Sequence, residues 1–389
     1  MEHTCDLLII GAGPAGVSTA LHLLQLDPTW KDRLLVLEKA AHPRPKLCGG
    51  GLTRPGLQIL RDLGFELPLP LPHEDIQDVH LAYSGRAIHV RGQPQFAVFH
   101  RPELDAYLAD QARRKGVTIL ENQPVEKLVV ESQGVVVATP GGFFRSRAVV
   151  GADGSKGVTQ RYVNRGRGGK RVARLLEVHE PGLEHPPAFV EQSAYFDFTP
   201  LRDRLQGYFW EFPFRLAGKP AFNYGVYDAR LARWRPKADL PGVLSRSMAE
   251  RRASLPDFKL EGHPINLFRP FNRIAVPRLL LVGDAAGVDP LFGEGIAPAL
   301  GYGQVAARTL QRAFGQGEFS FRNYRRDVLA SELGRYLLLR WGVAWWGYRL
   351  GWSPVFMHAL WTMGAILARL WPEPPHLFLE GPNLSKAPK

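Results

Sequence analysis

The feature that most constrains this fold is a glycine-rich turn near the N-terminus, between a strand-like and a helix-like segment. Residues 6–10 read DLLII, a short apolar run typical of a buried parallel strand. Residues 11–16 read GAGPAG, and the VSTALHLLQL that follows has apolar residues at helical spacing. A GxGxxG pattern between a strand and a helix predicts a Rossmann-type βαβ unit that binds a dinucleotide.

Each glycine of this turn has a physical task. Gly11 permits the tight turn, Gly13 lets the backbone approach a pyrophosphate, and Gly16 lets the helix pack against the strand. The helix N-terminus then directs its free N–H groups at the phosphates, with Ala15 in the same site. Glu38 ends the next apolar run, about twenty residues further on, where a ribose-binding carboxylate is expected. The alternative is a plain glycine-rich turn, with Glu38 only at the end of a strand.

Two later turns also follow apolar, strand-like segments. The first contains Asp153 and Gly154 in VVGADGS, and the second contains Gly283 and Asp284 in LLLVGDAAG, with GEGI at 293–296 after it. In this order, the three motifs resemble the para-hydroxybenzoate hydroxylase superfamily of flavoproteins. The resemblance covers residues 11 to 296 and implies that the bound dinucleotide is FAD.

The resemblance also implies roles for individual residues. Asp284 would hydrogen-bond the ribityl chain of FAD, and Asp153 would lie near the pyrophosphate. Arg101, in HRPELDAYL, matches the arginine that begins a helix beside the flavin. The alternatives are a turn aspartate at 153, a helix cap at 284 and a surface helix residue at 101. The glycine-rich segment implied to pass beside the isoalloxazine ring contributes Gly293, Gly295 and Ile296.

Two further segments narrow the expected reaction. Residues 46–52 read KLCGGGL, and residues 208–213 read YFWEFP, with NYGV at 223–226. These segments resemble the KxCGGG and YxWxFP…NxG patterns of the geranylgeranyl reductase family, which uses reduced FAD to saturate carbon–carbon double bonds of isoprenoid chains. The family often has proline where Leu47 stands and lysine where Phe214 stands. The match assigns Lys46, Gly49 and Gly50 to the flavin site.

The residue types suit that chemistry. A run of glycines lets the backbone lie against a flat ring. Tyr208, Trp210 and Phe212 share one face of a strand and, with Phe222 and Asn223 nearby, are expected to bind a hydrocarbon chain. Hydride addition to an isolated alkene also needs a proton. Cys48 is the candidate catalytic acid, because a buried thiol stays protonated. The alternatives are that Cys48 and the aromatic face only fill the core.

Other functions remain open at this point. A flavin-dependent monooxygenase or halogenase is the main alternative, because halogenases carry a related WxWxIP segment. A non-catalytic, membrane-associated flavin-binding protein is the third hypothesis. The pattern GYGQVA at 301–306 continues a helix-like stretch, so the chain has one dinucleotide fingerprint. NADPH or ferredoxin would therefore act as a transient electron donor. Substrates considered are a chlorophyll side chain, a quinone tail, an archaeal-type ether lipid and a carotenoid.

We expect an α/β fold in which a Rossmann-type FAD-binding domain is joined to a second, antiparallel-sheet domain. The FAD-binding domain would be discontinuous, and alternating patterns such as HLAYSGRAIHV and QGYFWEFPF predict strands of the substrate-binding domain. A helical segment would follow at the C-terminus. The expected bounds are 1–78, 99–165 and 276–330 for the FAD-binding domain, 79–98 and 166–275 for the substrate-binding domain, and 331–389 for the C-terminal segment.

The C-terminal segment and the net charge bear on partners. Residues 336–371 are rich in tryptophan, but arginines and Pro354 interrupt them, short of the ~20 apolar residues of a spanning helix. Attachment to a membrane surface is one interpretation, and a helical cap over the substrate domain is the other. The net charge is +12 without a long basic run, so no nucleic-acid partner is expected. With no metal-ligand spacing and no signal peptide, we expect no metal and a cytoplasmic location, peripheral to the cytoplasmic membrane if the segment attaches.

Overall fold

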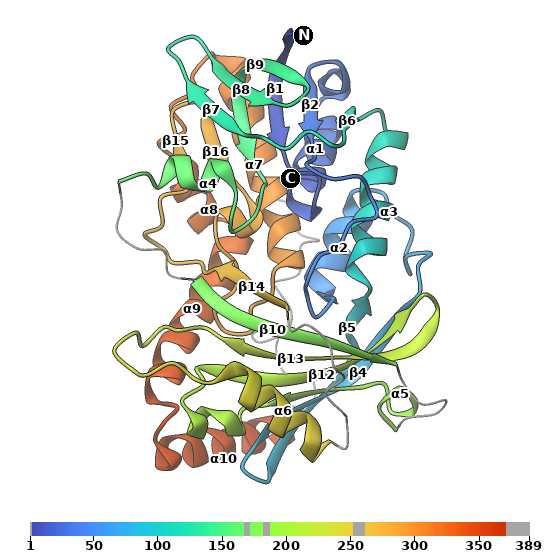
Figure 1. The fold of residues 1–389 in the computed structure, drawn as a ribbon, viewed down its shortest axis with the longest axis vertical. Coiled ribbons are helices and arrows are strands. Elements are labelled where there is room, and N and C mark those ends of the chain that lie inside the picture. Colours follow the sequence, from blue (N-terminus) through green and yellow to red (C-terminus); the bar gives the residue numbers. More distant parts are fainter. Residues whose placement is uncertain (1, 167–171, 182–186, 252–260, 371–389) are drawn as a thin grey trace.

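Two eight-stranded sheets, one above the other in Figure 1, form the core of the computed structural model. The structure describes residues 2–166, 172–181, 187–251 and 261–370. In the upper sheet, five strands run parallel, and their central segments, such as Leu7–Ile10 and Leu279–Leu281, are apolar and buried, as strands covered on both faces are. Their order is β6 (Ile119–Leu120), β2 (Leu34–Leu37), β1 (Glu2–Ile10), β9 (Gly142–Gly151) and β16 (Leu279–Leu281), with β15 (Ala275–Val276) antiparallel at the edge.

Helices cover the faces of this sheet, which explains why its strands are buried. Helix α1 (Pro14–Leu26) packs against the long helix α7 (Ile296–Gln316), and the Ser18 hydroxyl donates to the Leu300 carbonyl at 2.7 Å. The strands β7 (Lys127–Val130) and β8 (Val135–Thr139) form a hairpin that extends the sheet from β9. The remaining helices of this half are α2 (Arg54–Asp62), α3 (Arg101–Arg114), α4 (Val158–Val163) and α8 (Tyr324–Ala330).

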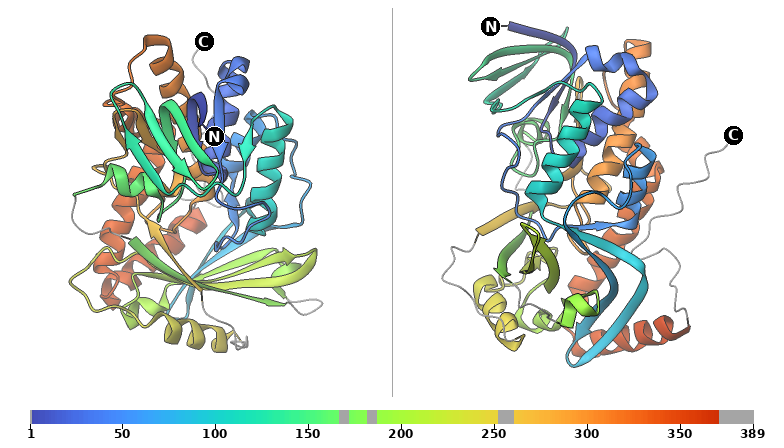
Figure 2. Two further views of the ribbon diagram at one scale, coloured as in Figure 1. Left: turned by 45° about the horizontal axis from the view of Figure 1, so that its top comes forward. Right: turned by 90° about the vertical axis from the view of Figure 1, so that its right-hand side faces the viewer.

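The lower sheet is antiparallel except for one parallel pair, β11 with β4. Figure 2 shows it as a strongly twisted layer beneath the upper sheet. Because side chains alternate between the faces of a strand, three adjacent strands of this sheet contribute to two separate apolar clusters, one on each face. The strand order is β14 (Glu261–Asn266), β10 (Val172–Pro181), β13 (Lys219–Asp228), β12 (Gly207–Leu216), β11 (Ser193–Asp197), β4 (His73–Tyr83), β5 (Arg86–Phe99) and β3 (Gly51–Thr53).

Helices also cover this second sheet. Helices α5 (Pro187–Val190) and α6 (Leu240–Glu250) lie on one face, while α9 (Glu332–Leu350) and α10 (Pro354–Leu370) lie on the other. The indole N–H of Trp361 donates to the Leu81 carbonyl at 3.1 Å, which fixes α10 against β4. Among the described residues, no helix is long and apolar enough to cross a bilayer. The predicted α/β fold, with its antiparallel second sheet and C-terminal helices, is confirmed.

The chain passes between the two halves several times. β3 and the beginning of β4 lie in the second sheet, although both precede residue 79. The division into domains with the expected bounds stays a prediction. Of the predicted C-terminal segment, residues 371–389 lie outside the described residues. Parts of the predicted substrate-binding domain, within 166–275, also lie outside them.

Candidate functional site

A cavity of about 700 Å³ lies between the two sheets and draws residues from both. The turn after β1, the segment after β2 and the start of α7 form its polar end, and β12 forms part of its apolar end. Four residues expected in the site, Gly16, Phe222, Asn223 and Gly283, do not line it. The expected residues that do are Gly11, Gly13, Ala15, Glu38, Lys46, Cys48, Gly49, Gly50, Arg101, Asp153, Gly154, Tyr208, Trp210, Phe212, Asp284, Gly293, Gly295 and Ile296.

The glycine-rich turn has the geometry that its sequence predicts. Gly11 has φ +111°, a conformation that L side chains rarely adopt. A Cβ at residue 16 would lie 1.9 Å from the Gly11 carbonyl oxygen, so only glycine lets α1 begin here. No side chain caps this helix, and Ala12 donates its N–H to a Glu38 carboxylate oxygen at 2.8 Å. The first turn of α1 thus keeps N–H groups for an anion, and Glu38 is held beside it.

Arg44 is a site residue that the sequence did not identify. Its Nε lies 3.2 Å from a Glu38 oxygen, and its Nη1 lies 3.4 Å from an Asp105 oxygen. A Cβ on Gly13 would come within 3.4 Å of the Arg44 Nη2 atom, so the guanidinium adjoins the phosphate-binding turn. A cation at this place suits a pyrophosphate. No sequence pattern marks Arg44, because it lies in a loop without a motif.

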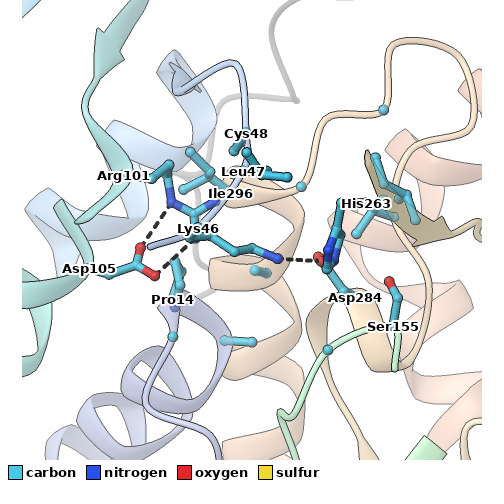
Figure 3. Close-up of a pocket in the computed structure, with 18 of the residues that line it drawn as sticks. Pro14, Lys46, Leu47, Cys48, Arg101, Asp105, Ser155, His263, Asp284 and Ile296 are labelled. Atoms are coloured by element: carbon cyan, nitrogen blue, oxygen red, sulfur yellow. Dashed lines mark hydrogen bonds and ion pairs between the residues drawn. The ribbon is translucent and has the colours of Figure 1, made fainter. Parts of the chain in front are cut away.

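Figure 3 shows two ion pairs in the cavity: Arg101 with Asp105, and Lys46, whose side chain extends from beside Arg101 to Asp284 on the other side. Arg101 forms a bidentate pair with Asp105, at 2.9 and 3.1 Å. Lys46 lies 3.5 Å from Asp284, and the His263 ring lies against that pair. Burial lowers the pKa of His263 to about 4, and the charge of Lys46 acts in the same direction. This imidazole is therefore neutral near pH 7.

Asp153 has a structural partner as well as a place in the cavity wall. Its carboxylate accepts the backbone N–H of Thr159 at 2.9 Å and also the Thr159 hydroxyl. The aspartate therefore caps the first turn of α4, as the plain turn interpretation expects. Its predicted position near the pyrophosphate stays a prediction.

The loop around Cys48 lies against the second sheet. Gly50 has φ +78°, and a Cβ there would lie 2.2 Å from the Phe99 carbonyl oxygen. Asn223 donates to the Cys48 carbonyl at 3.2 Å and accepts the Trp210 indole N–H at 2.8 Å. The Cys48 side chain lies beside the Arg101 guanidinium. Asn223, which does not line the cavity, thus links the Cys48 loop to the aromatic wall.

The apolar end of the cavity is aromatic. The rings of Phe196 and Tyr208 lie 5.1 Å apart, and those of Phe196 and Phe212 lie 5.0 Å apart. Tyr208, Trp210 and Phe212 share one face of β12, as their alternation predicts. Phe222, expected beside them, instead packs on the opposite face of the sheet with α6, because it has the other strand parity.

The polar end fits an FAD molecule by its own chemistry. A helix start without a capping side chain, a positive φ that favours glycine, a fixed carboxylate and an arginine suit a ribose and a pyrophosphate. The cavity continues from there to the aromatic wall, past Cys48 and the Gly293–Ile296 segment. FAD bound in this orientation would place its redox-active ring between the two ends.

Comparisons with known proteins agree with this site. The FAD binding domain family matches residues 4–300, which is most of the chain. The chain is 26% identical to a menaquinone reductase of Mycolicibacterium smegmatis, over 80% of this chain and 77% of that protein. It is 24% identical to a digeranylgeranylglycerophospholipid reductase of Methanosarcina acetivorans, over 82% and 78% of the two chains.

Solved structures share the fold. A geranylgeranyl bacteriochlorophyll reductase-like protein of Thermoplasma acidophilum aligns with TM-score 0.77 and 20% identity, over 98% of this chain and 94% of that one. A halogenase aligns with TM-score 0.66 and 18% identity, over 94% and 82%. The expected resemblance to geranylgeranyl reductases is confirmed. The chain belongs to the FAD binding domain family and is an FAD-dependent oxidoreductase similar to the geranylgeranyl reductases.

Proposed function

We propose that this protein saturates carbon–carbon double bonds of an isoprenoid lipid. The observation that carries the proposal is a cavity whose polar end fits FAD and whose other end is a wall of aromatic side chains. A hydrocarbon chain gains from burial against such a wall, which offers it few polar partners. The names of two relatives, a menaquinone reductase and a digeranylgeranylglycerophospholipid reductase, support a lipid as the substrate.

The residues of the chain have distinct tasks in this reaction. Reduced FAD, when bound, supplies a hydride to one carbon of the double bond. The aromatic face of Tyr208, Trp210 and Phe212 aligns the lipid chain and keeps water away from the reacting carbons. Lys46 and Asp284, with Glu38 and Arg44, hold the polar part of the cofactor. A protein acid must protonate the second carbon, and Cys48 is the acid expected from the sequence.

The test uses the FAD-loaded protein, reduced with dithionite without oxygen and mixed with detergent-dispersed geranylgeranyl lipids. We expect oxidised-flavin absorbance to return and lipid products to gain two hydrogens by mass spectrometry. The fold shared with a halogenase favours a second candidate, an oxygen-dependent flavoenzyme. A flavin that stays reduced until air enters, followed by an oxygenated or halogenated product, would favour that candidate. A flavin spectrum without turnover under either condition would point to a non-catalytic binding protein.

A matched pair of variants on β12 tests the aromatic wall. Trp210→Leu removes an indole that faces the cavity, whereas Phe209→Leu changes the adjacent residue, which faces α6. We expect Trp210→Leu to weaken lipid binding about 10-fold, because roughly 1–2 kcal/mol of aromatic burial is lost. Phe209→Leu should lower stability with little change in lipid binding. Equal lipid affinities in the two variants would show that this face does not bind the lipid.

We further propose NADPH or ferredoxin as the electron donor, because one dinucleotide fingerprint serves the FAD. Anaerobic mixing of the oxidised protein with NADPH, or with reduced ferredoxin, distinguishes the two. The productive donor should bleach the flavin absorbance within the time of turnover.

We also propose that α10 rests on an anionic bilayer at the cytoplasmic face of the membrane. One side of α10 packs on the second sheet through Met357 and Trp361, while Val355, Met363 and Ile366 on its other side are exposed. Arg86 donates to Thr362 of α10, Arg235 stacks over the exposed Trp352 two residues before α10, and Arg349 stacks over the exposed Trp234. Exposed apolar residues flanked by arginines suit the interface of an anionic bilayer.

A valine pair tests this surface. Val355 on α10 and Val190 on α5 are similarly exposed, at 80% and 75%. We expect Val355→Glu to reduce cosedimentation with vesicles that contain anionic lipid, because a carboxylate is costly to place among acyl chains. Val190→Glu adds the same charge elsewhere and should leave the bound fraction unchanged. Equal loss in both variants, or equal binding to neutral vesicles, would contradict docking through α10.

A further inference from the structure

A buried cluster of charged and hydroxyl groups forms one wall of the cavity, next to the Gly293–Ile296 segment. Arg340 of α9 reaches Asp289 at 2.7 Å and Glu294 at 3.7 Å. The hydroxyl of Thr53 lies 2.5 Å from one Glu294 oxygen, and the hydroxyl of Tyr336 contacts the other. All five side chains are buried or partly buried, and Thr53, Glu294 and Arg340 line the cavity itself. Tyr208 lies nearby.

The charges of this cluster do not balance if every group is ionised. Arg340 supplies one positive charge, whereas Asp289 and Glu294 together would supply two negative charges. A net charge away from water is costly, so one of the two carboxyl groups is favoured in its protonated form. The hydrogen-bond partners decide which of them holds the proton.

Among the described residues, the hydrogen-bond partners of the Asp289 carboxylate are N–H groups. The backbone N–H groups of Leu291 and Phe292 lie at 2.7 and 3.0 Å, and Arg340 Nη1 lies at 2.7 Å. None of these groups can accept a proton or a hydrogen bond, so Asp289 is the ionised member. Glu294, by contrast, contacts two hydroxyl groups, and a hydroxyl can donate or accept. A protonated Glu294 therefore keeps satisfied partners.

Burial and the neighbouring carboxylate also favour Glu294 as the protonated group. Burial raises the pKa of Glu294 above its ordinary value, with Asp289 acting in the same direction. The Arg340 guanidinium and the two hydroxyl groups oppose that rise. Arg340 already pairs with Asp289, because its Nη1 atom lies 2.7 Å from an Asp289 oxygen and 3.7 Å from a Glu294 oxygen.

We propose that Glu294 is the proton donor that completes the saturation of the double bond. The inference rests on the proposed reductase function. The hydride from reduced FAD forms a C–H bond at one alkene carbon, and the C=C π electrons take the Glu294 proton at the other. The O–H bond of Glu294 breaks, and its electron pair stays on the carboxylate. One solvent proton must restore Glu294 before the next turnover.

The cluster is also arranged to stabilise the carboxylate that this transfer leaves. Thr53 and Tyr336 can rotate their hydroxyl hydrogens toward it, and Arg340 is within 3.7 Å. Positioned groups of this kind need no reorganisation at the moment of reaction. Cys48 lacks this arrangement, because its neighbour Arg101 is a fixed cation that cannot relay a proton. On this proposal Glu294, rather than Cys48, donates the proton, and the catalytic role of Cys48 stays a prediction from the sequence.

The first test needs no turnover. Infrared spectra of the FAD-loaded, oxidised protein near pH 7 should contain the C=O absorption of a protonated carboxyl group. That absorption should shift on ¹³C labelling of glutamate and be absent from Glu294→Gln. Asp289→Asn should also remove it, because Glu294 would then ionise to balance Arg340. Cys48→Ala and the exposed-site control Glu126→Gln should keep it. A wild-type protein without this absorption, or a band unmoved by Glu294→Gln, would overturn the proposal.

The second test measures the reaction of the reduced flavin with lipid. Glu294→Gln should slow lipid-dependent flavin reoxidation by about 100-fold or more, the usual contribution of a general acid, while FAD binding stays intact. Glu126→Gln should react like the wild type. Equal rates in Glu294→Gln and wild type would rule out Glu294 as the donor. A wild-type protein that is itself inert to lipid would refute the reductase function instead, and the infrared result would then stand separately.

Discussion

Replacing Gly16 by alanine is expected to give a protein that no longer retains FAD. The added methyl carbon would lie 1.9 Å from the Gly11 carbonyl oxygen and 3.3 Å from the Ala152 Cβ. The oxygen belongs to the backbone of the phosphate-binding turn, so no side chain can swing aside to relieve the overlap. Either α1 moves away from β1 or the turn opens.

Both movements remove the N–H groups of the first turn of α1 from the place of the pyrophosphate. Relief of such an overlap typically costs 1–3 kcal/mol, so FAD binding should weaken about 10- to 100-fold. Absorbance of the purified protein reports the bound flavin, and titration with FAD gives the dissociation constant.

A matched glycine separates this effect from the general effect of alanine in a helix. Gly315, in α7, has no atom within 4 Å of the position that a Cβ would take. Gly315→Ala should bind FAD normally and gain about 0.5–1 kcal/mol in the free energy of unfolding. Normal FAD content in Gly16→Ala would show that the turn does not hold the pyrophosphate.

The nucleotide-binding half is the part that the sequence predicts best, and the reason is local geometry. A turn such as Gly11–Gly16 tolerates few other residues, because its backbone conformation and its contacts leave no room for side chains. In the sequence, such positions are recognised as glycines at fixed spacing. The alternation in β12 is equally local, and it correctly predicts that Tyr208, Trp210 and Phe212 share a face.

Residues that meet only through tertiary structure escape this kind of prediction. Arg44 carries no motif, and it becomes a site residue only because the loop after β2 folds back over Glu38. Asn223 is expected to contact the substrate, but it does not line the cavity and instead donates to the Cys48 carbonyl. Arg340 lies 51 positions after Asp289, inside a segment whose composition indicates a membrane interface or a cap. Its burial in the cavity wall depends on where α9 crosses the sheets.

The structure of the C-terminal segment explains why its sequence supports two interpretations, attachment to a membrane surface and a helical cap over the second sheet. α10 is apolar on both sides, so no polar face marks the side that meets solvent. Met357 and Trp361 fill the core of the second sheet, as a cap does. Val355 and Met363 remain exposed, as an interfacial helix requires. Periodicity alone does not separate two apolar faces with different partners.

Replacing Arg340 by methionine is expected to cause the largest loss of stability of any single change proposed for this protein. Arg340 is 2% exposed, and its guanidinium is the cation within reach of both Asp289 and Glu294. Its removal leaves the Asp289 carboxylate buried with the backbone N–H groups of Leu291 and Phe292 as its partners among the described residues. Breaking a buried pair from one side costs about 3–5 kcal/mol. The loss should appear in urea unfolding monitored by flavin and tryptophan fluorescence.

The partner substitution decides whether that loss reflects charge or packing. In Asp289→Asn/Arg340→Met, neither member of the pair is charged, so the double variant should recover part of the stability lost in Arg340→Met. A purely additive result would mean that Arg340 acts through the space it fills between Tyr336 and Phe292, whose rings its guanidinium covers at 4.3 and 5.4 Å. Coupling is expected instead, because Nη1 and the Asp289 carboxylate are 2.7 Å apart without water between them. The pair also ties α9 to the chain just before Gly293–Ile296, the segment expected beside the flavin, so its loss should weaken FAD binding together with stability.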